Sequence, residues 1–403
     1  MRKNQGITLV ALIITIIIML ILVAVSVNVL IKSNLIGTAE KAGDKYKTAT
    51  EEETKGGTIE INGKKYNSID DYMKEINPII VEPENIDDWI YAVEDDGTIT
   101  LNGYKGQDKE VVIPNYINGV PVKKLGYVVH GYGNGNPLGN FWDPSICKGG
   151  TISWYWKIQN DITSVVISEG IEMIDKDVFF ASQALTNVTI PSSVTSIGSN
   201  AFGNCTSLTE ITIPSSVTAI GSSAFGNCTS LTEITIPSSV TSIGSSAFSY
   251  CTSLTKITIP SSVTSIGSNA FGNCTSLTKI TIPSSVTSIE GGAFDNCTSL
   301  TEITIPSSVT SIGYSAFSNC TSLTEITIPS SVTAIGRGAF SNCTSLTEIT
   351  IPSSVTTMAG YVFGYIPLIT VHVPWKEGEK PDGWDENWAK TRSDYTITID
   401  YAK

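Results

Sequence analysis

The feature that most constrains the fold is a block of 23 residues that recurs through the second half of the chain. One copy, from Leu208 to Ser230, reads Leu-Thr-Glu-Ile-Thr-Ile-Pro-Ser-Ser-Val-Thr-Ala-Ile-Gly-Ser-Ser-Ala-Phe-Gly-Asn-Cys-Thr-Ser. Seven copies follow this pattern from Leu185 through Ser345, and an eighth, Leu346–Ile366, decays and lacks the cysteine. A block this short has no core of its own, so its apolar residues are buried only when successive blocks stack. The repeat therefore predicts a solenoid with one rung per copy.

Weaker copies extend the array at both ends. Ile162–Ala184 keeps apolar residues in the same register, and Ile99–Leu125 has the pattern of a leading rung. Between them, Val128–Trp156 is rich in Gly and aromatic residues and interrupts the register as an inserted loop. Downstream, Leu368–Pro374 predicts a last strand. The tryptophan-containing tail, Trp375–Tyr401, predicts a cap, because the open end of a solenoid needs covering.

Two strands are expected in each rung. Ile211 and Ile213 alternate with polar residues, which predicts a short strand with its apolar side inward. Pro214 ends that strand because it has no N–H to donate to a ladder. Val217 and Ile220 then return the chain along a second face. The rung pattern predicts a β-rich solenoid.

The rest of the rung is expected to close the core. Gly221 predicts a sharp corner, since a residue without Cβ is free of the usual backbone restriction. Ala224, Phe225 and Cys228 predict a turn or a single helical turn that carries apolar side chains inward.

Seven of the eight cysteines recur at one position of the rung, and the eighth, Cys147, lies in the inserted loop. The seven are Cys205, Cys228, Cys251, Cys274, Cys297, Cys320 and Cys343. Free cysteine behaves as a small hydrophobe, so this regularity predicts buried, reduced thiols. An occasional oxidised pair between neighbouring rungs stays open. No Cys-x-x-Cys pair typical of zinc sites is present in the sequence, and we expect neither a metal nor a cofactor.

The N-terminus has the pattern of a membrane anchor. Arg2 and Lys3 precede Ile7–Val27, a run of 21 residues without a charge. A helix of this length crosses about 30 Å of hydrocarbon at about 1.5 Å per residue. The basic residues place the N-terminus in the cytoplasm and the remaining chain outside.

The residues Lys-Asn-Gln-Gly-Ile-Thr-Leu-Val, Lys3–Val10, resemble a type IV prepilin leader. The resemblance implies cleavage between Gly6 and Ile7 and methylation of Ile7. That family usually has Glu at the fifth mature position, where this chain has Ala11, which argues against a working pilus subunit. An uncleaved signal anchor accounts for the same residues.

Composition shifts divide the remaining chain. Thr58–Tyr66 alternates around Asn62-Gly63, which predicts a β-hairpin, and Ile69–Ile76 predicts a short helix. We expect seven parts in all: a basic leader at 1–6, a transmembrane helix at 7–31, a helical stem at 32–57, a hairpin–helix spacer and linker at 58–85, an N-terminal rung with the aromatic-rich insert at 86–160, the solenoid at 161–374 and a C-terminal cap at 375–403.

The rung Ile-x-Ile-Pro-x-x-Val-x-x-Ile-Gly-x-x-Ala-Phe-x-x-Cys, seen in Ile211–Cys228, resembles the BspA-like leucine-rich repeats, also called treponemal-type repeats. The resemblance covers about Ile162–Pro374. It implies a leucine-rich-repeat solenoid at a bacterial cell surface, with a role in adhesion or in recognition of protein or glycan.

Several function classes are disfavoured. The formal net charge of −13 argues against nucleic acid, which requires a basic surface. Only two histidines, His130 and His372, are present, and neither a nucleophile elbow nor a phosphate-binding loop occurs. We therefore predict no enzymatic activity and no catalytic residues.

The outward side of the repeated strands is the first candidate binding face. Its residues are Glu210, Thr212, Glu233, Thr235, Lys256, Thr258, Lys279, Thr281, Glu302, Thr304, Glu325 and Thr327. The second candidate is an aromatic patch in the insert, formed by Tyr132, Trp142, Trp154 and Trp156. Exposed Thr suits any strand, and the aromatic residues could equally cap the first rungs. We expect a monomeric ectodomain that binds an extracellular protein or glycan, with the membrane as the partner of the N-terminal helix. The alternative is a structural spacer or minor pseudopilin-like component.

Overall fold

The computed structural model describes residues 59–61, 64–66, 80–126, 162–391 and 395–402. The chain divides into two compact units. The smaller unit comprises Met1–Glu84 and Pro114–Pro121, and the larger comprises Asn85–Ile113 and Val122–Lys403.

The described part of the smaller unit consists of short antiparallel pairs. Strands β1 (Ile59–Ile61) and β2 (Lys64–Tyr66) pair with Ile59 opposite Tyr66, as the alternation of this segment predicts. Strand β6 (Tyr116–Ile117) pairs with the start of β7 (Val120–Leu125). The Val81 amide donates to the Asn115 side chain at 2.8 Å, which ties the segment that begins at residue 80 to this turn.

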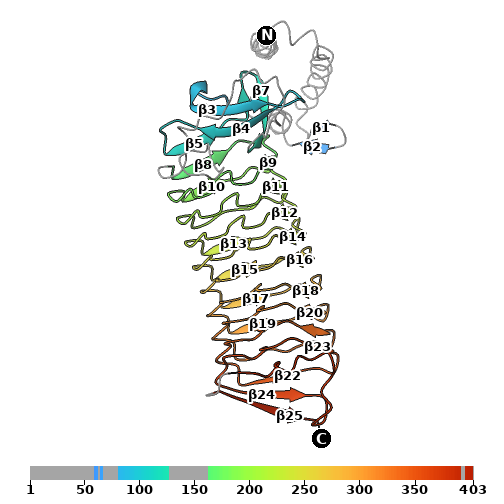
Figure 1. Ribbon diagram of the computed structural model, residues 1–403. Helices are drawn as coiled ribbons and strands as arrows, with labels where there is room; N and C mark the ends of the chain where they lie inside the picture. The colour runs from blue at the N-terminus through green and yellow to red at the C-terminus, as the bar shows by residue number, and fades with distance from the viewer. Residues whose placement is uncertain (1–58, 62–63, 67–79, 127–161, 392–394, 403) are drawn as a thin grey trace, which may run out of the picture. The chain divides into compact units, whose positions relative to one another are not determined.

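The larger unit is a solenoid of about ten turns, seen as a stack of rungs in Figure 1. Its first face is built from β5 (Glu110–Ile113), β8 (Ser164–Ile167), β10 (Asn187–Thr189), β13 (Glu233–Thr235), β15 (Lys256–Thr258), β17 (Lys279–Thr281), β19 (Glu302–Thr304), β22 (Glu348–Thr350), β24 (Leu368–Val373) and β25 (Thr396–Tyr401). Its second face holds β3 (Trp89–Val93), β4 (Ile99–Tyr104), β7, β9 (Met173–Ile174), β11 (Ser196–Ile197), β12 (Ala219–Ile220), β14 (Ser242–Ile243), β16 (Ser265–Ile266), β18 (Ser288–Ile289), β20 (Ser311–Ile312), β21 (Ala334–Ile335) and β23 (Thr357–Met358). The expectation of two strands per rung is confirmed for most rungs.

Strands of successive rungs pair in parallel and in strict register. Glu233 lies opposite Lys256, and Ser242 lies opposite Ser265, one repeat further along the chain. On the first face the rung that contains Glu210 forms no named strand; a bridge between Thr212 and Thr235 joins it to the following rung, and the Thr232 amide donates to the Thr209 carbonyl at 3.3 Å. Because the register equals the repeat length, each position of the rung forms a continuous column along the solenoid.

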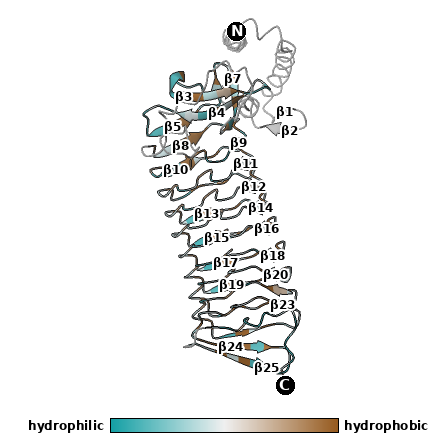
Figure 2. Ribbon diagram, in the orientation of Figure 1, coloured by the Kyte–Doolittle hydropathy of each residue, from teal (hydrophilic) through white to brown (hydrophobic). Residues whose placement is uncertain are grey.

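The core consists of these columns. The Phe side chains from Phe179 to Phe363 are fully buried, and neighbouring rings stack with centroids 5.2–5.9 Å apart. Leu, Ile, Val, Ala and Cys columns surround the rings and are likewise buried. In the strands of the first face the middle Ile is buried and its two neighbours are exposed. Figure 2 accordingly shows hydrophilic colour on β13, β15 and β17.

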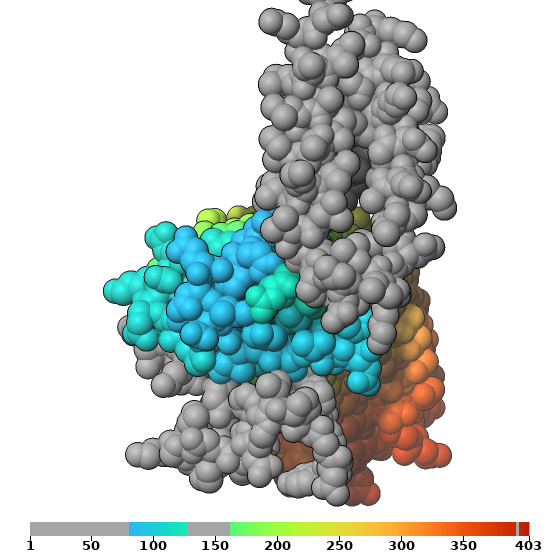
Figure 3. Space-filling model, turned by 90° about the horizontal axis from the view of Figure 1, so that it is seen from above, coloured from blue at the N-terminus to red at the C-terminus, as the bar shows by residue number. Residues whose placement is uncertain are grey.

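The N-terminal end of the solenoid is covered by an antiparallel hairpin. The short 3-10 helix η1 (Ile86–Asp88) leads directly into β3, and β3 pairs with β4. The connecting turn has Gly97 at φ +82°, while the Asp96 carboxylate accepts from the Thr98 amide at 2.9 Å. Trp89 and Tyr104 pack at 4.8 Å between ring centroids. Seen from this end, the blue and cyan atoms of the N-terminal strands overlie the later rungs (Figure 3).

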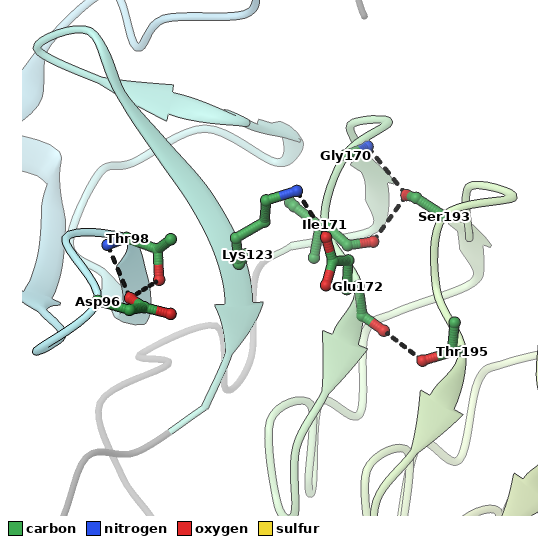
Figure 4. Close-up of polar contacts among 8 residues, drawn as sticks. All are labelled: Asp96, Thr98, Lys123, Gly170, Ile171, Glu172, Ser193 and Thr195. Carbon is green, nitrogen blue, oxygen red and sulfur yellow. Dashed lines mark hydrogen bonds and ion pairs between the residues drawn. The ribbon is translucent and has the colours of Figure 1, made fainter. Parts of the chain in front are cut away.

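Polar side chains also join each rung to the preceding one. Figure 4 shows Lys123 paired with Glu172 at 2.6 Å, which links the leading rung to the rung after the insert. The Ser193 hydroxyl donates to the Ile171 carbonyl at 2.7 Å and accepts from the Gly170 amide, and Thr195 donates to the Glu172 carbonyl at 3.2 Å. The second Ser after Pro repeats the bond of Ser193 from Ser216 to Ser331, as in Ser239 to the Val217 carbonyl at 2.6 Å, whereas the buried Ser354 hydroxyl has no partner among the described residues.

The glycine that recurs in the rung, as at Gly221 and Gly244, has a different role from the one predicted. Gly221 does not have a positive φ, so it is not required by the turn conformation. A Cβ at Gly221 would instead lie 2.5 Å from the carbonyl carbon of Gly198 in the preceding rung. A Cβ at Gly244 would lie at the same distance from the amide nitrogen of Ser222. The prediction that Gly221 is needed for the conformation of the corner is therefore wrong. Glycine is needed there because it lets the backbones of neighbouring rungs approach each other.

One rung that lacks this glycine lies at a break in the second face. Glu290 occupies the position of Gly221 and Gly244. The sheet of the second face, which runs from β3 to β16, stops there, and a separate sheet begins at β18. Where the glycine is present, as at Gly313, its amide donates to the Ile289 carbonyl of the preceding rung at 2.7 Å. At Glu290 the side chain is accompanied by loss of pairing between rungs, whereas Asp175 and Ala359 occupy the same position and their amides still donate to the preceding rung, at 2.8 and 2.9 Å.

The C-terminal end is closed by the tail. Strand β25 pairs with β24 along its whole length, from Leu368 opposite Thr396 to Val373 opposite Tyr401. Trp384 is buried, and its indole N–H donates to the Val355 carbonyl at 3.0 Å. Trp388 is buried edge-on against Phe363, the last ring of the Phe column, at 6.3 Å. An aromatic cluster therefore covers the open end of the core.

Several expectations fall outside the described residues. These are the basic leader at 1–6, the membrane helix at 7–31, the stem at 32–57, the helix at 69–76, and the aromatic patch of Tyr132, Trp142, Trp154 and Trp156. Within the ranges that the structure does describe, no helix is both long enough and apolar enough to cross a bilayer.

Candidate binding surfaces

The first candidate surface lies on the first face of the solenoid, and we call it the strand face. It comprises the twelve residues predicted from the repeat, all of which are exposed: Glu210, Thr212, Glu233, Thr235, Lys256, Thr258, Lys279, Thr281, Glu302, Thr304, Glu325 and Thr327. The parallel register brings them into two columns, one of Thr and one of Glu or Lys, with neighbouring strands about 4.8 Å apart. The structure therefore places the predicted residues on one continuous surface.

Charges along the strand face occur in blocks. Glu233 lies beside Lys256, Lys256 beside Lys279, and Lys279 beside Glu302. Lys279 forms an ion pair with Glu302 at 3.2 Å, with both side chains largely exposed. Exposed pairs of this kind contribute little to stability. Lys256 has no ion pair among the described residues, so its charge is available to a partner.

The Thr column of the strand face differs from the other Thr columns of the rung. Thr232 donates to the Thr209 carbonyl, and Thr241 donates to the Thr218 carbonyl, so these hydroxyls bond one rung to the next. By contrast, within the described part of the chain, Thr235 and Thr258 on the strand face have no side-chain hydrogen bond. Their hydroxyls point to solvent next to the charged column, where a ligand can reach them.

His372 lies in β24, two rungs beyond the last residues of the strand face. Its Nδ1 is 2.7 Å from a carboxylate oxygen of Asp400, and its Nε2 is 3.9 Å from Glu348. The ring is thus held between two exposed carboxylates on neighbouring strands.

The cysteine column has the chemistry of a core, as predicted. The seven thiols from Cys205 to Cys343 are free and buried. Burial raises the pKa of Cys251 to about 12, and it raises the pKa of Cys274 well above its usual value. A nucleophilic cysteine needs a lowered pKa and access to solvent, and these thiols have neither. Among the residues that the structure describes, no group of three or more His, Cys, Asp and Glu is arranged to hold a metal ion.

A second surface was not found from the sequence. It is a depression of about 580 Å³ on the turns after β20, β21 and β23, and we call it the aromatic depression. Tyr314, Arg337, Tyr361 and Tyr365 line it, together with small residues that include Ser318. The signal that could have revealed it is the departure of these positions from the repeat, since most rungs have Ser or Asn there.

Comparison with solved structures gives several likenesses. A leucine rich cell surface protein from Faecalibacterium prausnitzii is 28% identical over 79% of this chain and 94% of its own, with a TM-score of 0.44. A leucine rich repeat protein from T. pallidum is 27% identical over 59% of this chain and 89% of its own, with a TM-score of 0.42. The pneumococcal vaccine antigen PcpA is 18% identical over 78% of this chain and 97% of its own, with a TM-score of 0.45. No curated protein matches the chain.

The family comparison is more extensive. The model of the BspA type leucine rich repeat region matches residues 152–278 and 264–377 with six copies of the repeat. These stretches together span more than half of the 403-residue chain. They include all the rungs that form the strand face. The chain belongs to the BspA type leucine rich repeat family.

Proposed function

We propose that this chain is a recognition protein of the bacterial cell surface that binds an extracellular protein or glycan through the strand face. The observation that carries the proposal is the arrangement of twelve exposed side chains in register, with free Thr hydroxyls beside blocks of unlike charge. Repeat proteins commonly bind through an extended face of this kind. Adhesion is what the family resemblance implies.

Display outside the cell is the second part of the proposal. The basic leader at 1–6 and the uncharged run Ile7–Val27 support a membrane anchor whose remaining chain lies outside. The anchor is the membrane partner, and the stem and spacer at 32–85 hold the solenoid away from the bilayer. Mass spectrometry of the mature N-terminus tests how the anchor is processed. A methylated Ile7 indicates cleavage after Gly6, whereas an intact Met1 indicates an uncleaved signal anchor.

Binding by the strand face is tested with the full-length protein and a panel of extracellular matrix proteins and glycans. For a ligand that binds, the double variant Lys256→Gln and Lys279→Gln removes the positive block from the strand face. The control is Ser261→Glu with Ser284→Glu, which changes the net charge equally in the same two rungs but on the loop after the strand. We expect the first variant to weaken binding by about tenfold or more and the control to leave it unchanged.

Two results would oppose this proposal. Equal loss of binding in both double variants would indicate a general charge effect and not a site. Absence of any ligand, together with co-purification of the full-length protein with surface filaments, would favour the structural alternative, in which the solenoid is a spacer within an assembly.

A further inference from the structure

The aromatic depression is the place where the rungs depart most from their repeat. Three preceding rungs have Ser222, Ser245 and Ser268 at the position after the glycine. The next three rungs have Gly291, Tyr314 and Arg337 at that position. Tyr361 occupies a position where other rungs have Ser, Asn or Gly, and Tyr365 one where the seven regular copies have Asn except at Tyr250. In an array whose remaining positions are nearly uniform, departures that cluster on one surface indicate a local role.

The residues that depart from the repeat are sterically matched to one another. A Cβ on Gly291 would lie 2.2 Å from the ring of Tyr314, so the glycine makes room for that ring on the preceding rung. Tyr314 rests against the Gly291 backbone while 59% of its surface stays exposed. Tyr365 is 52% exposed. Exposed tyrosines are thus displayed around the depression and are not folded into the core.

Two cations accompany these rings. The Arg337 guanidinium carbon lies 5.5 Å from the centroid of the Tyr361 ring, and Lys390 Nζ lies 6.0 Å from the same centroid. Neither cation forms an ion pair with a carboxylate among the described residues. The nearby Asp385 carboxylate accepts from the Asn387 amide at 2.7 Å and caps the turn of the tail. The residues that line the depression therefore include one cation, Arg337, and no carboxylate, on a chain whose formal net charge is −13.

We propose that the aromatic depression binds a carboxylated sugar, such as a uronic or sialic acid unit of an oligosaccharide. Tyrosine rings pack against the C–H face of a pyranose, and Arg337 offers the planar pair of donors that matches a carboxylate. Ser341 lines the same depression; its hydroxyl donates to the Gly364 carbonyl at 2.9 Å and can still accept a hydrogen bond from a sugar hydroxyl. Its volume of about 580 Å³ lies within the range of about 300–1,000 Å³ for ligand sites.

This site is separate from the strand face, so the inference goes beyond the proposed function and fails independently of it. The strand face belongs to the first strand of each rung, whereas the depression lies on the turns after the second strand. Substitutions at Lys256 and Lys279 test the first surface, and substitutions at Arg337 and Tyr361 test the second.

The test is isothermal titration of the full-length protein with two carboxylated probes, tetragalacturonate and sialyllactose, and with their neutral partners, maltotetraose and lactose. Tetragalacturonate reports a uronic acid and sialyllactose a sialic acid. We expect saturable binding of at least one carboxylated probe, with an affinity about tenfold or more above that of its neutral partner, and a decrease as salt is added.

The variants restore the repeat residue, so other rungs show that each position accepts it. Arg337→Ser gives the residue of Ser268, and Tyr361→Asn gives that of Asn269, which has nearly the same positive φ, 55° against 58°. Both should weaken binding about tenfold or more. Tyr250→Asn is the matched control, because Tyr250 is an exposed tyrosine at the position of Tyr365 but outside the depression. Absence of binding by both carboxylated probes, equal binding of neutral partners, or unchanged affinity in Arg337→Ser overturns the proposal.

Discussion

The thiol of Cys251 donates a hydrogen bond to the carbonyl oxygen of Phe225 in the preceding rung, at 3.2 Å. That same carbonyl also accepts from the Cys228 amide within its own rung. The bond is repeated from Cys205 to Cys343. A residue at this position must be small and apolar and must satisfy a carbonyl of the neighbouring rung. Cysteine meets these needs, because its thiol is a weak donor on a small hydrophobic side chain.

The raised pKa of the buried thiols predicts a loss of stability in alkaline solution. Burial raises the pKa of Cys251 from 9.0 to about 12, so between these values the unfolded chain loses a proton that the folded chain keeps. The stability that the protonated thiol contributes is complete below about pH 9. It is lost as the pH rises toward 12, and the free energy of unfolding falls by at most about 1.4 kcal/mol per pH unit for each thiol. Urea denaturation at increasing pH measures this slope. In Cys251→Ala the slope should be shallower, and a parallel decline in both proteins would show that the thiol does not contribute.

The Phe column predicts a large cost for a break in its middle. Phe271 is fully buried, with Phe248 and Phe294 stacked at 5.6 Å on either side. Phe271→Ala should lower the free energy of unfolding by about 3–5 kcal/mol through lost burial and a cavity. Chemical denaturation measures the change. Thr258→Ala, an exposed substitution on β15, is the control and should cost much less, and equal effects of the two substitutions would argue against the column as the main source of stability.

The glycine that faces the preceding rung predicts opposite effects for exchanges at two matched positions. Gly244→Glu should lower the free energy of unfolding by about 1–3 kcal/mol, because its Cβ would lie 2.5 Å from the Ser222 amide nitrogen. Glu290→Gly should raise stability and slow hydrogen exchange of the amide at 290, since β16 and β18 could then pair. Denaturation together with hydrogen exchange measures both. Unchanged exchange at 290 would mean that the glutamate is not what separates the two sheets.

The C-terminal tryptophan cluster predicts a local effect. Trp388 covers the edge of Phe363, and its carbonyl accepts from the Val362 amide at 3.1 Å. Trp388→Ala should expose the end of the core and speed hydrogen exchange in the last rung, Leu346–Ile366. The distant rung Leu208–Ser230 should keep its protection, because each rung contacts mainly its neighbours. Equal acceleration in both rungs would point to a global loss of stability and not to capping.

Much of the fold could be predicted from the residues of one rung. The alternation of Ile211 and Ile213 and the return through Val217 and Ile220 correctly indicated two strands, and the cysteine period correctly indicated buried thiols. The exposed positions of the strand face followed from the same alternation. The reason for Gly221 was not predicted, because contact with the preceding rung depends on how two copies stack and not on the conformation of either copy alone.

The sequence by itself determined the period, the inward columns and the outward columns, because a 23-residue register repeated without slippage leaves only one way to bury every copy. Tertiary structure decided what lies between copies. It separated the sheets at Glu290, and it brought Tyr314, Arg337 and Tyr361 to one depression. These residues are distant along the chain. Their proximity depends on the path of the turns and the spacing of the rungs, which are set by backbone packing between neighbours.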